Sequence, residues 1–413
     1  MKILYLVHQF YPESYTGTEK FVYNIALITQ KFGNKVKVIT YSFYENTYYD
    51  KSIGDILAKE FVYKGIPVLA FKSINQPYDL HFGLENQDMY NFAENIIKEE
   101  NPDIIHVGHS MRVHGFIKAA IKLNIPYILT LTDFFLMCPK VILTTTSGDL
   151  CIGPQDGITC NKMCREFSEI YIKNRLKQAE YIFMNAEKIL SPSKFLADIF
   201  KKEFPNITID IVPHGIKYKN IKTNNKTYED KKNLTFCYAG SLQYHKGVHV
   251  LLKAFRSIEN ENIRLKIYGS GPEEYVNKLK DIVKNDDRVE FCGVFSEEQV
   301  ILSSIDVIVI PSICYESYSL ILHEALAQNI PVIASNLGAM LQKIKDGFNG
   351  FIFEAGNYMD LKNKVELILN NPEILNEIKK NIEQKDYITT IEQEACVYNN
   401  FYLTLVQSKS HLI

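Results

Sequence analysis

The sequence lacks the features that mark membrane-spanning, secreted and nucleic-acid-binding proteins. No stretch approaches the roughly 18 to 20 uncharged apolar residues that would span a bilayer. The opening apolar run, residues 1–9, has no small-residue cleavage site behind it and predicts a strand, not a signal peptide. Lysine and arginine number 46 against 48 aspartate and glutamate, so the net charge of -2 gives no positive field to attract nucleic acid.

Cysteine is too sparse for a disulfide scaffold. Eight cysteines in 413 residues without a secretion signal favour reduced thiols or metal ligands in the cytoplasm. The sequence shows no repeat of 20 to 50 residues and no low-complexity tract. With 46% hydrophobic and 23% charged residues, the composition is that of a soluble globular protein, and the length predicts two or three domains.

Short apolar runs alternate with helical stretches in the first half of the chain. The runs at 3–7, 36–40, 104–107 and 127–131 are apolar on both faces, which is typical of buried parallel strands. The stretches 21–32, 88–100 and 115–123 carry apolar residues at helical spacing. This alternation predicts a doubly wound α/β sheet.

The pattern stops and then starts again. Residues 213–233 are polar and rich in lysine and asparagine, and we interpret them as the connection between domains. Strands are then predicted at 234–239, 265–268, 289–291, 307–310 and 331–334, which makes a second Rossmann-like unit. We expect domains at 1–214 and 215–390, with a C-terminal helix at 391–413 that packs back on the first domain. Ligands of such sheets bind beyond the carboxyl ends of the strands.

The most informative motif lies at 311–333. A strand ends at Pro311, and a helix with Ser319 as its N-cap follows; Asn329 can take the left-handed conformation at the end of the helix. Free amides at a helix start bind phosphate, so Ser319 and Leu320 form a candidate diphosphate cradle. Glu316 and Glu324 would flank it and accept hydrogen bonds from sugar hydroxyls; otherwise they are two solvated glutamates.

Glu316 and Glu324, with seven residues between them within Pro-Ser…Glu…His-Glu-Ala-Leu-Ala, closely resemble the paired-glutamate signature of the retaining glycosyltransferases of family 4. The resemblance continues in the N-terminal strand with its glycine loop, in Pro213-His214-Gly215 at the domain junction and in the glycine loops at 240–247 and 269–272. It implies a GT-B fold, in which two Rossmann-like domains face each other across a cleft. It also implies transfer of a sugar from a nucleotide diphosphate, UDP or GDP, with retention of configuration.

The resemblance assigns donor-site roles to particular residues. Glu316 holds the donor sugar, Glu324 holds the ribose, and Lys246 offsets the charge of the leaving diphosphate. Thr16 and Gly17 stand where the family usually has two glycines. The remaining donor-site positions lie at strand or helix ends and are Ser241, Gly271, Val294, Ser319 and Leu320. We expect Glu316, Lys246 and Asp133 to be the catalytic residues.

Two departures from the family pattern affect the diphosphate site. Ser241 stands where the family usually has arginine, and a hydroxyl cannot replace a guanidinium fork. His245 could supply the second cation instead; alternatively, transfer is slow or the protein is a non-catalytic relative. The sequence also has no Asp-x-Asp pair at a strand end to bind a divalent ion, so we expect metal-independent transfer.

Polar residues also follow two strands of the first half. His109 follows the strand at 104–107, and Thr132 and Asp133 follow the strand at 127–131. Similar proteins usually have His-Asp at the second position, where Thr132 here replaces the histidine. We assign His109 and Thr132 to the acceptor side, with the alternative that such residues serve only as helix caps. The tyrosine-rich segment 41–49 could contact the acceptor or simply pack on its own domain.

Four cysteines lie in one loop with several glycines and threonines: Cys138, Cys151, Cys160 and Cys164. Four thiolates can bind a tetrahedral zinc ion, although the Cys-x-x-Cys spacing of strong zinc motifs is absent. A structural zinc site and free thiols both remain open, and disulfides are less favoured.

The sequence therefore predicts a retaining, metal-independent glycosyltransferase. Its expected partners are a nucleotide-sugar donor and a glycan or lipid-linked acceptor, with no nucleic acid and with the oligomeric state undetermined. Its expected location is the cytoplasm, with peripheral association at the inner face of the membrane as an option. A non-catalytic glycosyltransferase-like partner is the alternative. A nicotinamide-dependent oxidoreductase is disfavoured because no Gly-x-Gly-x-x-Gly follows the first strand.

Overall fold

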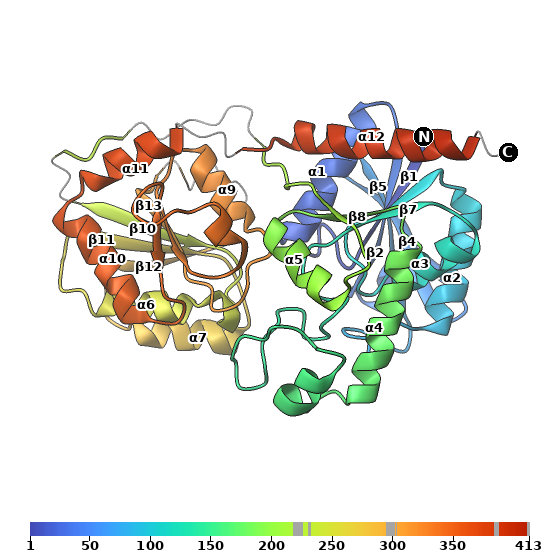
Figure 1. Cartoon of the computed structure of the whole chain (residues 1–413), viewed down its shortest axis with the longest axis horizontal. Coiled ribbons are helices and arrows are strands. Elements are labelled where there is room, and N and C mark those ends of the chain that lie inside the picture. The colour runs from blue at the N-terminus through green and yellow to red at the C-terminus, as the bar shows by residue number, and fades with distance from the viewer. Residues whose placement is uncertain (218–225, 230–232, 295–301, 303, 384–387, 411–413) are drawn as a thin grey trace. The chain divides into compact units, whose positions relative to one another are not determined.

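A computed structural model describes residues 1–410 except 218–225, 230–232, 295–301, 303 and 384–387. The chain divides into two compact units (Figure 1). Unit 1 comprises Met1–Gly215 together with Thr390–Ile413, and unit 2 comprises Ile216–Thr389. In the described part of the chain, no helix combines the length and the apolar character needed to cross a membrane.

The described strands of unit 1 form one nine-stranded sheet in the order β3-β4-β5-β2-β1-β6-β7-β8-β9. Neighbours from β5 to β9 run parallel, whereas β3 and β4 add an antiparallel edge. All four residues of β6 and all four of β7 are buried, as expected for parallel strands covered on both faces. The strands are β1 Lys2–Val7, β2 Lys35–Tyr41, β3 Lys51–Ile53, β4 Ile56–Tyr63, β5 Ile66–Ser73, β6 Ile104–Val107, β7 Tyr127–Thr130, β8 Lys188–Ser191 and β9 Ile209–Ile211.

The helices of unit 1 begin at recognisable caps. Thr16 and Glu19 form a capping box at the start of α1, and the Asn86 side chain accepts a hydrogen bond from the Met89 amide at the start of α2. Asn101 ends α2 in the left-handed conformation. The helices are α1 Gly17–Lys31, α2 Gln87–Glu100, α3 His114–Lys122, α4 Glu169–Met184, α5 Lys194–Glu203 and α12 Ile391–Ser410.

The C-terminal helix α12 belongs to unit 1, where it packs beside α1 (Figure 1). Tyr398 and Tyr402 are fully buried in the core that α1 shares with the sheet. The Tyr402 hydroxyl lies 2.6 Å from Nδ1 of His106 on β6, and the Tyr398 hydroxyl lies 3.3 Å from Oγ1 of Thr130 on β7. Unit 1 is therefore built from two stretches of chain that are separated by the whole of unit 2.

Unit 2 is a second Rossmann-like unit, with six described strands that run parallel in the order β12-β11-β10-β13-β14-β15. The strands are β10 Leu234–Ala239, β11 Ile263–Tyr268, β12 Val289–Gly293, β13 Val307–Ile310, β14 Val332–Ser335 and β15 Phe351–Phe353. The helices are α6 Val248–Arg256, α7 Glu273–Ile282, α9 Leu320–Ala327, α10 Tyr358–Asn370 and α11 Ile374–Glu383. The prediction of two Rossmann-like units is confirmed.

Candidate functional site

In unit 2, the loops that follow β10, β11 and β13 pack backbone against backbone. Gly247, at φ +69°, leaves no room for a side chain, because a Cβ there would lie 1.8 Å from the carbonyl oxygen of Pro311. A Cβ on Gly271 would likewise lie 1.9 Å from the carbonyl oxygen of Leu242. The Leu242 amide donates a 2.8 Å hydrogen bond to the carbonyl oxygen of Ser270. These contacts fix the strand-end loops that carry the predicted donor-site residues.

Lys246 and Glu316 form an ion pair between two of these loops. Lys246 Nζ lies 2.7 Å from Oε1 of Glu316, which also accepts a 2.5 Å hydrogen bond from the Ser312 hydroxyl. The Glu316 carbonyl oxygen accepts a 2.8 Å bond from the Ala339 amide, which anchors the loop. Burial alone would lower the pKa of Lys246 and raise that of Glu316, but their mutual attraction outweighs burial and reverses both shifts. Both side chains are therefore charged at neutral pH.

Helix α9 begins directly after this pair. Ser319 is its N-cap in the left-handed conformation, and its hydroxyl makes no capping hydrogen bond. Leu320 is the first helical residue, and Glu324 lies about one turn later with a partly exposed side chain. Asn329 adopts the predicted left-handed conformation beyond the end of the helix. Glu316 and the α9 start thus lie along one short stretch of chain, and the ion pair brings Lys246 from the loop after β10 to that stretch.

Ser241 stands where the family usually has arginine, and the nearby His245 carries no charge that could replace it. Ser241 follows β10, and its carbonyl oxygen accepts a 2.7 Å hydrogen bond from the Tyr238 hydroxyl. Burial, reinforced by the adjacent charge of Lys246, lowers the pKa of His245 to about 4. His245 is therefore a neutral imidazole at neutral pH when no donor is bound, and its role as the second cation stays a prediction.

Val294 directly follows β12, and 52% of its surface is exposed. Its neighbour Phe295, which belongs to the predicted base-contacting segment, lies outside the described residues.

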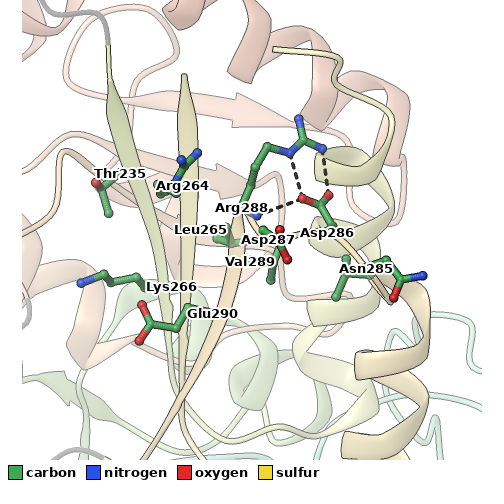
Figure 2. A pocket seen from close by; sticks show the side chains of 11 residues that line it. Thr235, Arg264, Leu265, Lys266, Asn285, Asp286, Asp287, Arg288, Val289 and Glu290 are labelled. Atoms are coloured by element: carbon green, nitrogen blue, oxygen red, sulfur yellow. Dashed lines mark hydrogen bonds and ion pairs between the residues drawn. The ribbon is translucent and has the colours of Figure 1, made fainter. Parts of the chain in front are cut away.

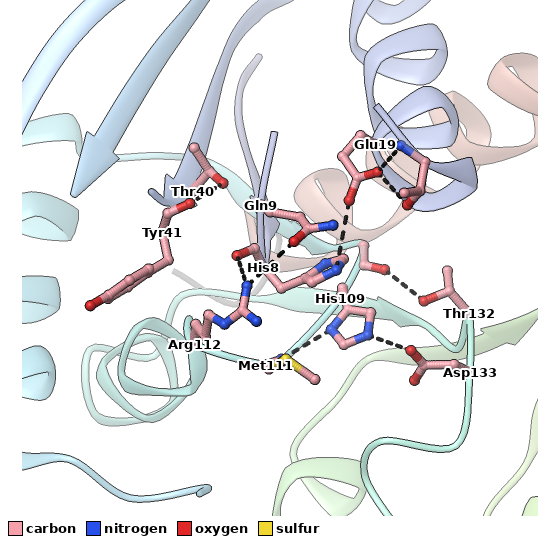
Figure 3. Close-up of polar contacts among 12 residues, drawn as sticks. His8, Gln9, Glu19, Thr40, Tyr41, His109, Met111, Arg112, Thr132 and Asp133 are labelled. Atoms are coloured by element: carbon pink, nitrogen blue, oxygen red, sulfur yellow. Dashed lines mark hydrogen bonds and ion pairs between the residues drawn. The ribbon is translucent and has the colours of Figure 1, made fainter. Parts of the chain in front are cut away.

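In unit 1, the polar residues at the ends of β1, β6 and β7 meet (Figure 3). His109 Nε2 lies 2.6 Å from Oδ2 of Asp133, and His109 Nδ1 accepts a 3.1 Å bond from the Met111 amide. This arrangement makes Nε2 the protonated nitrogen, which donates to the carboxylate. His109 is almost fully buried, whereas the Asp133 side chain is 29% exposed. Thr132 is oriented elsewhere, and its hydroxyl donates to the Gly108 carbonyl oxygen at 3.4 Å.

His8 and Glu19 extend this cluster and were not singled out from the sequence. The His8 ring lies 4.0 Å from the His109 ring, and its Nε2 lies 3.6 Å from Oε1 of Glu19 (Figure 3). Burial raises the pKa of Glu19 and lowers that of His8 well below its usual value. Thr16 and Gly17 lie at the exposed start of α1, where the Thr16 amide and hydroxyl each donate to Glu19 at 2.5 Å. The rule that polar residues at strand ends form sites would have found His8.

Arg112 is the other functional candidate that the sequence did not reveal. It follows β6 in the left-handed conformation, at φ +61°, and its guanidinium donates to the His8 carbonyl oxygen (Figure 3). The positive φ of Arg112 could not be predicted from the sequence, because glycine and asparagine are the residues that usually adopt this conformation.

The predicted zinc site in the cysteine loop is not formed. Within the described residues, no group of three or more His, Cys, Asp or Glu side chains could hold a metal ion. The four thiols are free and buried, and burial raises the pKa of Cys138 to about 11 and that of Cys160 to about 12. The zinc prediction for Cys138, Cys151, Cys160 and Cys164 is therefore not confirmed, and the structure shows four buried free thiols.

A hollow in unit 2 lies away from these residues (Figure 2). It is lined by Thr235 at the start of β10 and by residues near the start of β12, whereas the predicted donor residues follow the strand ends. Arg288 spans one side and pairs with both carboxylate oxygens of Asp286 at 2.8 Å. None of the predicted donor residues lines this hollow.

Comparison with known proteins places both units in one family. The family model described as Glycosyltransferase Family 4 matches residues 15–219, and the model described as Glycosyl transferases group 1 matches residues 219–385. An uncharacterized glycosyltransferase of Methanocaldococcus jannaschii is 26% identical over 317 residues, which cover 75% of this chain and 76% of the relative. O-antigen chain mannosyltransferase C of Escherichia coli is 21% identical over 432 residues, which cover 99% of this chain and all of the relative.

Solved structures show the same fold. The Anabaena protein HepE, in complex with UDP and glucose, superimposes with a TM-score of 0.69 at 16% identity, covering 100% of this chain and 99% of that one. The two family models, which together span residues 15–385, and these whole-length similarities lead to one conclusion: the chain belongs to the family 4 glycosyltransferases and has the Rossmann-like units of the GT-B fold.

Proposed function

We propose that this protein is a retaining glycosyltransferase that moves a hexose from a UDP- or GDP-sugar to a hydroxyl of a glycan or lipid-linked acceptor without a metal ion. The observation that carries the proposal is the Lys246–Glu316 pair, which lies at the ends of β10 and β13 beside the start of α9. A fixed cation, a carboxylate and helix-start amides are the groups that a nucleotide diphosphate sugar needs. The similarity to O-antigen chain mannosyltransferase C of Escherichia coli supports a glycan acceptor.

Each group has a distinct task in the proposed donor complex. Lys246 and the amides of Ser319 and Leu320 bind the diphosphate, while Glu316 accepts hydrogen bonds from the donor sugar and Glu324 from the ribose. Because Glu316 pairs with Lys246 when no donor is bound, the donor must insert its phosphate beside the lysine without leaving the carboxylate unpaired. Glycine at position 271 lets the backbone approach the phosphates closely, and Val294 lies where the base would pack.

The bond between the anomeric carbon and the phosphate oxygen breaks, and its electron pair stays on the leaving diphosphate. The acceptor hydroxyl oxygen attacks from the same face, and its proton passes to that phosphate oxygen, which gives retention without a covalent enzyme intermediate. Lys246 stabilises the negative charge that develops on the diphosphate. In unit 1, Asp133, held by His109, orients the acceptor hydroxyl, and Thr16 and Gly17 offer an exposed backbone to the donor phosphates.

The test is a transfer assay with UDP, GDP, ADP and CDP sugars, read by release of the nucleotide diphosphate. Nuclear magnetic resonance of the product anomer checks retention, and assays in excess chelator check metal independence. Inverted configuration would overturn the retaining mechanism, and loss of activity in chelator would overturn metal independence. Turnover of none of the donors would overturn the enzyme assignment.

Two glutamate variants separate the proposed roles. Glu324→Ala should weaken nucleotide affinity about tenfold or more, because hydrogen bonds to a charged group contribute about 1.5 to 3 kcal/mol. Glu316→Ala should reduce kcat more than affinity. Calorimetric titration with the cognate nucleotide measures both, with Glu373→Ala as an exposed control. Unchanged affinity in Glu324→Ala would remove the ribose assignment.

A non-catalytic binding partner is the second candidate, because Ser241 and the neutral His245 leave the diphosphate loop with less positive charge than the family's arginine would give it. This candidate predicts that the protein binds the nucleotide diphosphate sugar in calorimetry but releases no nucleotide diphosphate in the donor panel.

A further inference from the structure

Unit 1 carries an aromatic segment to which the proposed function gives no role. The segment, residues 41–49, begins at the last residue of β2, and its rings contact one another. Tyr41 and Phe43 lie 5.3 Å apart between ring centroids, Tyr44 and Tyr48 lie 4.2 Å apart, and Tyr48 and Tyr49 lie 5.4 Å apart. Phe43 is 42% exposed, and Tyr44, Tyr48 and Tyr49 are partly exposed, so much of this aromatic surface faces solvent.

A basic side chain lies against each of three rings of the segment. The distances to the ring centroids are 4.9 Å for Arg112 on Phe43, 4.4 Å for Lys59 on Tyr48 and 6.0 Å for Lys72 on Tyr49. The antiparallel pairing of β4 with β5 places Leu57 opposite Lys72, so Lys59 and Lys72 point to the same face of the sheet. We call these three side chains and the segment the cation–aromatic patch.

The three cations bond to neutral groups. Lys59 Nζ donates to the Tyr48 carbonyl oxygen at 2.9 Å, and Lys72 Nζ donates to the Tyr44 carbonyl oxygen at 3.0 Å. Arg112 donates to Nδ1 of exposed His81 at 2.8 Å and to neutral oxygens of His8 and Gln9. Among the described side chains, none of the three has a carboxylate within 4.0 Å. By contrast, two other lysines of this sheet, Lys37 and Lys51, both pair with Glu60.

Arg112 is also incompletely satisfied. Its Nε is buried and has no hydrogen-bond partner in the structure, and its backbone holds the left-handed conformation at φ +61°. A buried donor without a partner and a strained non-glycine backbone each oppose folding, and such features concentrate at binding sites. Glu13 lies close enough for the charges of Arg112 and Lys72 to lower its pKa, but burial has the larger effect and raises it. The Glu13 carboxylate accepts a hydrogen bond from the Phe43 amide. Glu45, within the segment, and Asp50, directly after it, are exposed at the surface.

The patch adjoins the proposed acceptor residues. Arg112 bonds the carbonyl oxygen of His8, whose ring lies 4.0 Å from that of His109, the partner of Asp133 (Figure 3). The strands that precede these residues, β2, β1 and β6, are neighbours in the sheet, and their carboxyl ends share one edge. A molecule with its hydroxyl at Asp133 could therefore extend over the patch.

We propose that the cation–aromatic patch binds an acceptor saccharide that carries an oxyanion, either a phosphate ester or a carboxylate. Aromatic rings stack on the apolar faces of sugars, and Arg112, Lys59 and Lys72 supply charge-assisted hydrogen bonds to the anion. This inference rests on the proposed function and narrows its acceptor to an anionic sugar.

The absence of tryptophan from the sequence makes the patch directly observable. Phe43→Trp introduces a single tryptophan, and Phe43 lies beside Arg112. The variant is titrated with glucose 1-phosphate, glucuronate and glucose. We expect a saturable change in emission with at least one charged sugar and none with glucose, and the charged sugar that binds more tightly identifies the anion.

Variants in the Phe43→Trp background assign the binding to the three cations. Lys59→Gln together with Lys72→Gln should weaken the charged sugar at least tenfold. Lys51→Gln, in the same part of the sheet but paired with Glu60, should change the affinity less than twofold. Arg112→Gln should weaken binding of the charged sugar more than the two lysine substitutions do. The melting temperature of the Arg112→Gln variant shows whether it folds. If it does not, the lysine variants alone decide whether the cations bind the sugar.

A flat titration with both charged sugars, an equal response to glucose or equal weakening by Lys51→Gln would each overturn the proposal. The outcome is separable from the proposed function, because hydrolysis of the donor without acceptor reports on Lys246 and Glu316 and should be unchanged in the Lys59→Gln, Lys72→Gln protein. Charged-sugar binding in a protein that turns over no donor would overturn the enzyme and support the patch. Donor turnover without charged-sugar binding would overturn the patch and support the enzyme.

Discussion

Lys246 supplies the positive charge on the diphosphate loop, because its neighbour His245 is neutral and Ser241 has no charge. Ser241→Arg should tighten binding of UDP or GDP about tenfold, since charge-assisted bonds to phosphate are among the strongest that a side chain makes. Calorimetry measures the change, and Ser241→Gln controls for side-chain size. Weaker binding by Ser241→Arg would mean that another group already fills the space.

The Lys246–Glu316 pair also makes a pH prediction. The pKa of Glu316 is lowered below its usual 4.5, so its contribution to stability is present above pH 4.5 and is lost as the pH falls through the lowered value. The pKa of Lys246 is raised above 10.5, so its contribution is present below that pH and is lost as the pH rises further. Between these limits the contribution should be constant.

Urea unfolding of the wild type and of Glu316→Gln at a series of pH values tests this. The difference in free energy of unfolding should be flat from about pH 6 to 9 and should shrink below about pH 4.5. A difference that already declines near pH 6 would contradict the lowered pKa of Glu316.

The loop that presents Lys246 depends on a glycine. Gly247→Ala should destabilise unit 2 by about 2 to 4 kcal/mol, because its Cβ would meet the Pro311 carbonyl oxygen and its φ is positive. Gly347 has a similar φ of +71°, but a Cβ added there would have no atom within 4 Å, so Gly347→Ala should cost only about 1 kcal/mol. Urea denaturation compares the two. Equal losses would show that the contact with Pro311 yields easily.

The sequence predicted the fully buried strands best. Strands β6, β10 and β13 begin and end at the expected residues, because their apolar runs are continuous and bounded by polar residues or turns. The hairpin of β4 and β5 was missed: β4 alternates buried and exposed residues, and the two-residue turn at Lys64 and Gly65 relies on two positive φ values. A lysine in that conformation gives no turn signal.

The candidate site was predicted only in part, because strand ends can be predicted from the sequence but loop conformations cannot. Lys246 and Glu316 are 70 positions apart but both follow parallel strands, so strand ends indicated a shared edge. Their direct ion pair could not be predicted, because it depends on the contact between Gly247 and Pro311. Arg112 and the bond between His109 and Asp133 depend likewise on loop conformations that residue types do not specify.

The division of the whole chain assigns a structural role to α12. The Tyr402 hydroxyl contacts both His106 and the Tyr5 hydroxyl inside unit 1. Tyr402→Phe should lower the free energy of unfolding of unit 1 by about 1 to 3 kcal/mol, because it leaves buried polar groups without a partner. Urea unfolding measures the loss, with Tyr358→Phe, at a 39% exposed position on α10, as the control. An effect no larger than the control would mean that water or a neighbour replaces the hydroxyl.

The discontinuity of unit 1 also sets the order in which the protein can mature. Unit 2 ends at Thr389, so all of its residues leave the ribosome before α12 does. Its parallel sheet can fold during translation, as domains generally do. The first stretch of unit 1 is made before unit 2 but lacks Tyr398 and Tyr402 until α12 has followed unit 2, so its core around His106 is incomplete meanwhile. Of the two units, the one whose synthesis begins earlier is therefore the one that is completed later.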